Sequence, residues 1–289
     1  MSLVSSKPNH KVLVICGPTA TGKTALGVRL AKTFNGEIIS ADSRQVYKGM
    51  IALTGKGDSN PNIKVWLQSI VEPGKDFNIA RWRKMFWEAA NQIWSQNKLP
   101  IAVGLSGFYL SALTQNIETI DIPPNETLRK ELESKSVEEL TEIMKSKNPE
   151  RFNKMNNSDR MNPRRLIRAI EVAGSGGLAH FNARQERRLK AANPDFLFIG
   201  LIAPMEEINK RIDKSVDERI KDAILETKEL LGKNISLTKP ALQTHGFRNL
   251  APHVKGEIPL DVAVEKWKTG EHQDARKQYS RLKKEKDIN

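Results

Sequence analysis

The chain has 289 residues, which suits two domains or one α/β domain that carries an insertion. Hydrophobic residues make up 38% of it and charged residues 28%, so it can bury a core and is not a disordered polymer. Lys and Arg number 47 against 34 Asp and Glu, and the net charge of +13 favours a polyanionic partner such as nucleic acid, or a membrane surface.

The same composition excludes several classes of protein. The single cysteine, Cys16, cannot form an internal disulfide, which excludes a disulfide-stapled secreted fold. The five histidines have no metal-ligand spacing. The longest apolar runs, 12–16 and 196–203, fall far short of the roughly 20 residues that span a bilayer, and the first residues lack a signal-peptide core. We therefore expect a cytoplasmic monomer with no membrane contact.

The first hundred residues alternate between the patterns of buried strands and of helices. Strands are expected at 11–16, 37–40 and 99–104, where short apolar runs end at glycine or small polar residues. Helices are expected at 24–34, at 79–96 and from about 107. This alternation predicts parallel strands joined by helical crossovers.

The pattern changes after Ile122. From 125 to about 189 the periodicity is helical, and a strand returns at 195–203, followed by helices at 205–231 and 259–285. We predict an α/β core made of residues 1–121 and 195–289, with an all-helical insertion domain at 122–194. Residues 151–190 hold ten Lys or Arg and three Asp or Glu, a net charge of +7.

Residues 17–24, Gly-Pro-Thr-Ala-Thr-Gly-Lys-Thr, match the phosphate-loop pattern G-x-x-x-x-G-K-[ST] at every fixed position, between a predicted strand and a predicted helix. Backbone N–H groups of such a loop converge on phosphate oxygens, and the helix N-terminus adds partial positive charge. Lys23 would neutralise the phosphates, and the Thr24 hydroxyl suits a Mg²⁺ ligand. A phosphate-loop-NTPase-like parallel sheet flanked by helices is therefore expected.

Two more polar residues follow predicted strands. Asp42 comes just after the second strand and Ser106 just after the third, so both should share the carboxyl edge of the sheet with Lys23. Asp42 could hold Mg²⁺ through water or accept a proton from a nucleophile, and a helix-capping role is the alternative. For Ser106, a hydrogen-bonding or metal-linked role is favoured over covalent catalysis, since G-x-S-x-G would require glycine at 108, and a capping serine is the alternative.

Within the insertion, Arg164 and Arg168 share one helix face while Leu166, Ile167 and Ile170 can pack inward. Arg165 adds a third charge beside them. This arginine cluster suits an RNA backbone, and a solvated basic face without a partner is the alternative.

These segments together resemble one family, the tRNA dimethylallyltransferases, also called tRNA isopentenyltransferases. The resemblance runs through nearly the whole chain in the family's order. It is carried by GPTATGKT (17–24), IISADSRQVYKGM (38–50), PIAVGLSGFYL (100–110), MNPRRLIRAIEV (161–172), FLFIGLIAPMEEINKRI (196–212), HGFRNL (245–250) and ARKQYSRLK (275–283). A phosphate loop alone is common, whereas this ordered series is specific.

The resemblance implies transfer of a dimethylallyl group from dimethylallyl diphosphate to N6 of the adenosine 3′ of the anticodon in tRNA. Asp42 would be the general base, Ser106 would bond the bridging oxygen of the diphosphate, and Lys23 would act with them. Mg²⁺ is the implied cofactor, with Thr24 as its ligand. The insertion would clasp the anticodon stem-loop.

The implied binding residues fall into two groups. The diphosphate-binding residues are Gly17, Thr19, Ala20, Thr21, Gly22, Lys23 and Thr24. The tRNA-binding residues are Asp42, Ser43, Arg44, Gln45, Ser106, Arg164, Arg165, Leu166, Ile167, Arg168, Gly246, Phe247, Arg248, Arg276, Lys277 and Gln278. Arg44 and Gln45 would lie against the flipped-out adenine.

The chain departs from the family pattern at several points. Where the family reads R-I-x-x-R, Arg211 is followed by Ser215 in place of the second arginine. Arg219 lies one turn further along the same helix face, and we expect it to bind the diphosphate instead. The other departures, which favour an altered tRNA range or weaker activity, are at Leu105, Gly55–Gly57, Val65–Trp66 and Arg281–Leu282.

Two alternatives stay open on the residues alone. A phosphate-loop kinase acting on a small molecule or a nucleotide would use the same loop, although the basic insertion has no purpose there. A divergent tRNA-binding protein without chemistry would explain the departures, although Lys23, Asp42 and Ser106 are intact.

Overall fold

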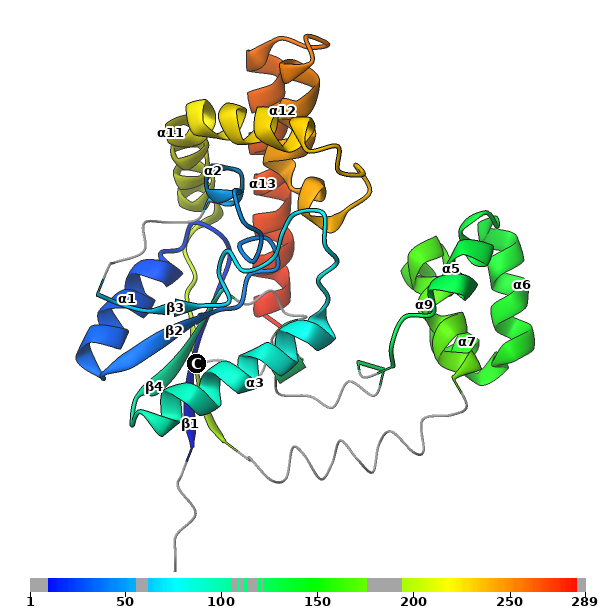
Figure 1. Cartoon of the computed structure of the whole chain (residues 1–289), viewed down its shortest axis with the longest axis horizontal. Coiled ribbons are helices and arrows are strands. Elements are labelled where there is room, and N and C mark those ends of the chain that lie inside the picture. The colour runs from blue at the N-terminus through cyan, green and yellow to red at the C-terminus, as the bar shows by residue number, and fades with distance from the viewer. Residues whose placement is uncertain are drawn as a thin grey trace, which may run out of the picture. The chain divides into compact units, whose positions relative to one another are not determined.

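The computed structural model describes residues 10–55, 62–104, 109, 112–113, 119–120, 122–175 and 194–284 (Figure 1). The chain divides into two compact units, Met1–Gln115 with Asn193–Asn289, and Asn116–Ala192. The first unit holds a five-stranded sheet with the order β3-β2-β4-β1-β5, and every strand pair in it is parallel. The α/β prediction with a parallel sheet is therefore confirmed. Within the described residues no helix is long and apolar enough to cross a membrane.

The elements of the first unit begin with the strands of the sheet. These are β1 (Lys11–Cys16), β2 (Gly36–Ser40), β3 (Val65–Trp66), β4 (Leu99–Gly104) and β5 (Asp195–Gly200). Its α-helices are α1 (Lys23–Thr33), α2 (Ile51–Thr54), α3 (Ile79–Ser95), α11 (Met205–Gly232), α12 (His245–Val254) and α13 (Leu260–Leu282), with a 3₁₀ turn at Pro240–Gln243.

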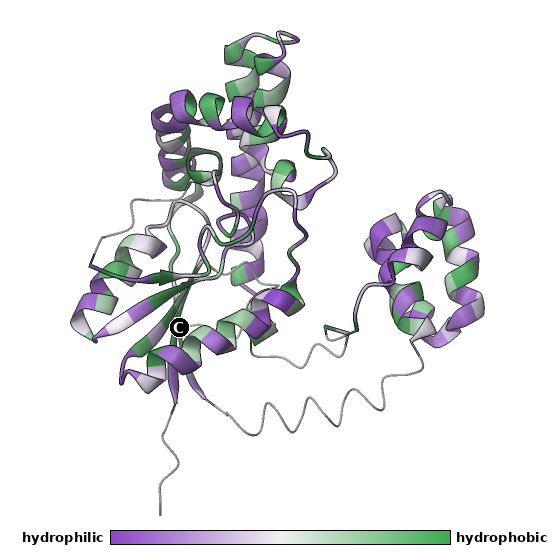
Figure 2. Cartoon of the chain, in the orientation of Figure 1, coloured by the Kyte–Doolittle hydropathy of each residue, from purple (hydrophilic) through white to green (hydrophobic). Residues whose placement is uncertain are grey.

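Both faces of the sheet are covered, as the apolar strand sequences require. Ile15, Ile38 and Val103 belong to the cluster under α1, and Gly27 of α1 lies so close that a Cβ there would be 2.7 Å from Val103. Strand residues of the opposite parity, such as Val14 and Ile39, are also fully buried and point to the face that α3 covers. The apolar strands and the striped helices over them are visible in Figure 2.

Elements α2, β3 and the ten-residue α12 were not expected from the sequence. A four-residue helix and a two-residue strand are too short to produce a periodic pattern. Strand β5 ends at Gly200, three residues before the predicted end, and it is half exposed at the sheet edge, with Leu197 58% exposed. Of the helix expected from about 107, only the helical residues 109, 112 and 113 are described.

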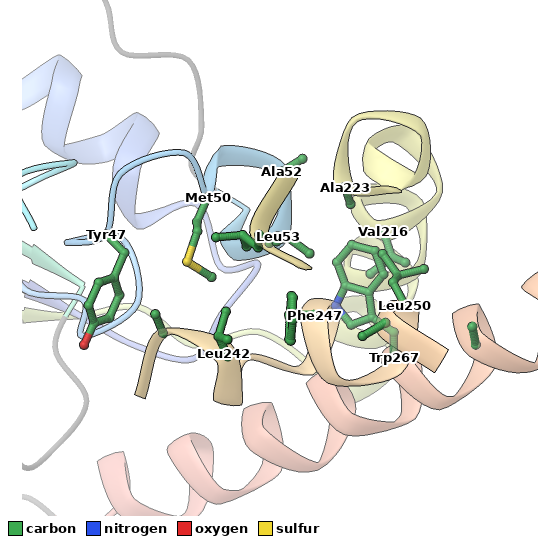
Figure 3. Packing of buried hydrophobic residues seen from close by; sticks show 14 of the residues in the cluster. Tyr47, Met50, Ala52, Leu53, Val216, Ala223, Leu242, Phe247, Leu250 and Trp267 are labelled. Atoms are coloured by element: carbon green, nitrogen blue, oxygen red, sulfur yellow. The ribbon is translucent and has the colours of Figure 1, made fainter. Parts of the chain in front are cut away.

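Helices α11, α12 and α13 pack with α2 into a second hydrophobic cluster (Figure 3). Trp267 and Phe247 are buried at its centre, beside Leu53 of α2. The Glu226 carboxylate accepts hydrogen bonds from the first three N–H groups of α2, residues 51–53, at 2.8–2.9 Å. Those amides have no partner inside so short a helix, so a side chain of α11 fixes where α2 begins.

The second unit contains α5 (Glu126–Glu133), α6 (Val137–Lys147), α7 (Pro149–Lys154), α8 (Asn157–Arg160) and α9 (Pro163–Gly174). Each of these helices starts at a side chain that accepts a hydrogen bond from the backbone: Asn125, Ser136, Asn148, Asn156 and Asn162. Its core includes Leu140, Leu166 and Ile170, all fully buried. The unit thus carries its own apolar core.

A buried carboxylate ties α9 to the start of α5. Glu171 is 1% exposed at its side chain and accepts from both Arg129 Nε (2.7 Å) and the Asn125 N–H (2.8 Å). Arg168 donates to the same carboxylate at 3.1 Å. Burial raises the pKa of Glu171, but the hydrogen bonds from Arg129, the Asn125 N–H and Arg168 outweigh it and hold that pKa below its usual value.

Glu171→Gln should therefore destabilise the second unit by about 3 kcal/mol at neutral pH, because two arginines lose their buried counter-charge. A carboxyl with a lowered pKa stabilises the fold above its usual pKa and ceases to do so as the pH falls through its folded value. Amide hydrogen exchange in α9 should be roughly 10²-fold faster in the variant at pH 7, and the difference should shrink only as the pH falls below about 4.5. Glu142→Gln, at a 72% exposed carboxylate paired only with Lys145, is the control. Equal exchange in both variants would contradict the role of Glu171.

Candidate phosphate-loop site

A cavity of about 910 Å³ opens at the carboxyl edge of the sheet, where ligands of open parallel sheets bind. Its wall combines the phosphate loop and α1 with the ends of β2 and β4 and one face of α11. Polar members include Lys23, Thr24, Asp42 and Gln45. An apolar part of the wall is formed by Val28, Ile38, Val65 and Val103. The cavity therefore offers both an anion-binding end and an apolar surface.

The phosphate loop has the backbone that its glycines predict. Gly17 has φ +150°, and a Cβ on it would lie 2.4 Å from the carbonyl oxygen of Leu201, so only glycine fits there. Gly22 precedes α1 with φ +87°. Within the loop, the hydroxyl of Thr21 donates to the Pro18 carbonyl at 2.8 Å. Thr24, in the first turn of α1, is exposed and lines the cavity.

Lys23 bends back over this loop, and its Nζ donates to the Pro18 carbonyl at 2.6 Å. Burial lowers the pKa of Lys23 to about 8, against the opposing pull of the nearby Asp42 carboxylate. An ammonium group held in a poorly hydrated place binds anions more strongly than a solvated one, because less hydration is lost on binding. The Lys23 ammonium is thus well placed to bind a phosphate oxygen.

Asp42 closes a tight turn after β2. Its Oδ1 accepts the backbone N–H of Arg44 at 2.8 Å and that of Gln45 at 3.4 Å. Asp42 thus caps a turn and not the helix N-terminus that was the alternative to a site role, and its hydrogen bonds to the described residues use Oδ1 alone. Asp42 also lines the cavity, which leaves the second oxygen for a ligand.

The residues after Asp42 have different surroundings. Ser43 is exposed, and Arg44 donates through Nη1 to the Pro240 carbonyl. Gln45 lines the cavity, where its Oε1 accepts from Gln68 Nε2 at 3.3 Å. Gln68 was not identified from the sequence, and no local pattern marks it; its neighbours Leu67 and Ser69 both have positive φ, a strained conformation that is frequent at functional sites.

Tyr109 is a further residue near the site that the sequence did not indicate. Its ring packs edge-on against Trp82 of α3 at 4.4 Å, and Trp82 Nε1 donates to the Ser40 carbonyl at 3.1 Å. Burial raises the pKa of the Tyr109 phenol, with Asp42 adding to the effect. Tyr109 therefore supports the segment that carries Asp42. Ser106, predicted to share this edge, lies outside the described residues.

Arg211, Ser215 and Arg219 all line the cavity from α11, as their shared helix face predicts. The guanidinium of Arg219 is committed in part: Nε donates to the Ser215 carbonyl at 2.8 Å and Nη1 to the Ala52 carbonyl at 2.6 Å. It also lies over the Trp267 ring, 5.1 Å from the centroid. Arg219 is thus half-buried beside Ser215, the position where the family has its second arginine.

The tRNA residues expected in the second unit are not equally available. Arg164 and Arg165 are exposed, with Arg165 paired to Asp159. Arg168 instead donates to the carbonyls of Thr119 and Ile122 at 2.7 Å each and to Glu171, so its charge is used inside the unit. Leu166 and Ile167 are buried in the core, and their expected tRNA contact is corrected to an inward-packing role for both side chains.

The same division occurs in α12 and α13. Phe247 is 2% exposed, so its side chain packs in the core and not against RNA. Gly246 is packed so closely against Leu53 and Trp267 that it offers RNA no side chain and little surface. Arg248 is exposed. On α13, Arg276 and Lys277 are exposed, whereas Gln278 Oε1 accepts the Thr19 N–H of the phosphate loop at 2.8 Å.

Comparisons with known proteins point to one family. A family model described as IPP transferase matches residues 45–285, and one described as isopentenyl transferase matches residues 10–65. The chain is 35% identical over 277 residues to a tRNA dimethylallyltransferase of Acetivibrio thermocellus, covering 94% of this chain and 88% of that protein. It is 33% identical over 288 residues to that of Halothermothrix orenii, covering 97% and 87%.

Solved structures give the same result. A tRNA isopentenylpyrophosphate transferase from Bacillus halodurans aligns with a TM-score of 0.67 and 27% identity, covering 97% of this chain and 89% of that one. A eukaryotic dimethylallyltransferase acting on tRNA aligns with a TM-score of 0.78 and 26% identity, covering 93% and 68%. With a family model over most of its length and relatives above 30% identity along nearly all of it, this chain belongs to the IPP transferase family.

Proposed function

We propose that this protein transfers a dimethylallyl group from dimethylallyl diphosphate to N6 of the adenosine that follows the anticodon in tRNA. The observation that carries the proposal is the placement of Asp42 and Lys23 in one cavity that also has an apolar wall. The cavity can therefore hold a diphosphate and a short prenyl chain, and it has a carboxylate that can accept a proton from an amine. The named relatives are tRNA dimethylallyltransferases, which supports the choice of acceptor.

The anion-binding end takes the diphosphate. The backbone N–H groups at the start of α1 and the Lys23 ammonium surround it, as in other phosphate loops. The wall of Val28, Ile38, Val65 and Val103 suits the dimethylallyl chain, whose burial there removes apolar surface from water. The described residues of the first unit assemble this cavity alone, which supports action as a monomer, and the tRNA substrate supports a cytoplasmic location.

The reaction forms one bond and breaks one. N6 of adenine attacks C1 of the dimethylallyl group, the C1–O bond breaks, and the diphosphate leaves with the electron pair. The proton on N6 passes to the free carboxylate oxygen of Asp42, whose other oxygen is held by the turn. Lys23 stabilises the charge that develops on the leaving diphosphate.

The donor atoms at this end of the cavity also fit Mg²⁺. A threonine hydroxyl and a carboxylate are hard oxygen ligands, and Mg²⁺ is usually held by few protein oxygens together with substrate phosphates. Thr24 would hold the ion. When bound, Mg²⁺ neutralises charge on the leaving group.

Asp42→Asn should reduce the rate of prenyl transfer by about 10²–10⁴-fold, because the amide keeps an oxygen for the turn but cannot accept the proton. Binding of diphosphate and of tRNA should stay within a few-fold of wild type. The assay is mass spectrometry of nucleosides from tRNA incubated with protein, Mg²⁺ and dimethylallyl diphosphate. Asp76→Asn, at an exposed carboxylate paired with Lys239, is the control. More than about a tenth of wild-type turnover in Asp42→Asn would refute the general-base role.

The affinity for tRNA should fall steeply with salt, and Arg164 and Arg165 should account for part of the slope. Each neutralised phosphate contributes roughly 0.7–0.9 to the slope of log K against log salt, so the double Ala variant should flatten it by about 1.5. Arg168→Ala should leave the slope nearly unchanged and lower the stability of the second unit instead, since that guanidinium binds carbonyls. Fluorescence anisotropy at several salt concentrations measures both. An unaltered slope in the double variant would place the RNA elsewhere.

Arg219 should compensate for the arginine missing at 215. Arg219→Ala should raise the KM for dimethylallyl diphosphate about tenfold or more, because a hydrogen bond to a charged group is worth about 1.5–3 kcal/mol. Ser215→Arg should bring little gain, and Lys214→Ala, at a 78% exposed side chain, should be silent. Thermal unfolding of each variant separates lost donor binding from the lost Ala52 contact. A silent Arg219→Ala together with tighter donor binding in Ser215→Arg would end the compensation hypothesis.

A further inference from the structure

The phosphate loop is held from outside by a residue far away in the chain. The N–H of Thr19 donates to Oε1 of Gln278 at 2.8 Å, across 259 residues of sequence. The next loop residue, Ala20, has φ +60°. For a residue other than glycine this left-handed conformation costs about 1–2 kcal/mol, and it persists only where the surroundings enforce it.

The helix that supplies this hydrogen bond packs against the hydrophobic cluster as far as Tyr279, close to its last residue, Leu282. Trp267 and Ala275 of α13 are fully buried, and Tyr279 packs against the same hydrophobic cluster. Ala20 of the phosphate loop packs against that cluster too. Because the backbone N–H can only donate, the carboxamide oxygen of Gln278 must face the loop, which leaves its NH₂ group for other partners. Gln278 and the cluster together hold Thr19 and Ala20 in place.

The other side of the same helical turn is cationic. Arg276 and Lys277 are exposed, and among the residues that the structure describes Lys277 pairs with Asp274 alone, at 3.5 Å. Helix α13 ends at Leu282, about one turn beyond Gln278. Terminal turns of helices fray, so the contact between Gln278 and Thr19 depends on the order of this last part of α13. Phosphates bound to Arg276 and Lys277 would restrain it.

We propose that Gln278 is a positioning residue that couples RNA binding at the basic end of α13 to the conformation of the phosphate loop. The inference rests on the proposed function and extends it to how RNA binding orders the phosphate loop. RNA on Arg276 and Lys277 keeps α13 folded, Gln278 then holds Thr19, and the loop presents its remaining N–H groups to the diphosphate. Diphosphate and RNA therefore bind more tightly together than separately, and linkage requires the same factor in both directions.

The test uses the full chain with inorganic diphosphate, Mg²⁺ and an unmodified anticodon stem-loop RNA. The dissociation constant of each ligand is measured by calorimetry with and without saturating amounts of the other. In wild type each should tighten the other about fivefold or more. In Gln278→Ala the coupling factor should fall to about one, diphosphate binding alone should weaken several-fold, and RNA binding alone should change less than twofold. Gln273→Ala, at an exposed glutamine on the same helix, should match wild type.

A second variant separates the hydrogen bond from folding and from charge. Gln278→Glu keeps an oxygen acceptor for the Thr19 N–H, so it should retain the coupling factor while its charge weakens diphosphate binding overall. If Gln278→Ala proves unfolded, Gln278→Glu and the exchange rate of the Thr19 amide in both RNA states decide the question.

Three results would overturn the proposal. These are the absence of coupling in wild type, full coupling in Gln278→Ala, and a loss of RNA affinity in Gln278→Ala when diphosphate is absent, which would make Gln278 an RNA contact. A stem-loop that binds with coupling but is never prenylated would refute the proposed function alone. A stem-loop that does not bind wild type would refute both.

Discussion

A single close approach of two backbone segments sets the conditions for the whole cavity. The carbonyl of Leu201, just after β5, lies where a Cβ on Gly17 would be, so the loop after β1 is pressed against the segment after β5. This contact turns the loop away from the strand direction and leads it into α1 through Gly22. Any larger residue at position 17 would displace Lys23 and the amides that follow, and with them the anion site.

The two units use polar groups in contrasting ways. In the first unit, Lys23, Asp42 and Gln45 keep donor or acceptor capacity toward a cavity. In the second unit, Arg129 and Arg168 both pair with one buried carboxylate, that of Glu171. Basic residues therefore cannot be counted as RNA ligands from sequence alone. Exposure and hydrogen-bond partners decide which of them remain available to a polyanion.

The sequence predicts best where local physics decides the structure. The phosphate loop, the strands β1, β2 and β4 and the long helices follow from glycine conformation and apolar periodicity within a few residues. Leu166 and Ile167 show two lines of reasoning in conflict, because helical periodicity placed them inward and the family resemblance placed them against tRNA. The structure buries both.

What could not be predicted depends on contacts distant in the chain. Arg168 binds carbonyls 46 and 49 residues earlier, and α2 begins where Glu226 meets its amides. Gln278 reaches the phosphate loop across almost the entire chain. No local pattern encodes such pairs, so these long-range hydrogen bonds can be found only from the three-dimensional structure.

The environment of Lys23 has a consequence for proton exchange with solvent. Because burial lowers the pKa of Lys23 to about 8, its ammonium group loses its proton in mildly alkaline solution, where an exposed lysine keeps it. An arriving dianionic or trianionic ligand favours the ammonium form and raises that pKa, so binding draws a proton from the buffer. The apparent binding enthalpy near pH 8 therefore contains the ionisation heat of whichever buffer is used, and the affinity declines with alkalinity even though the ligand itself becomes more negative.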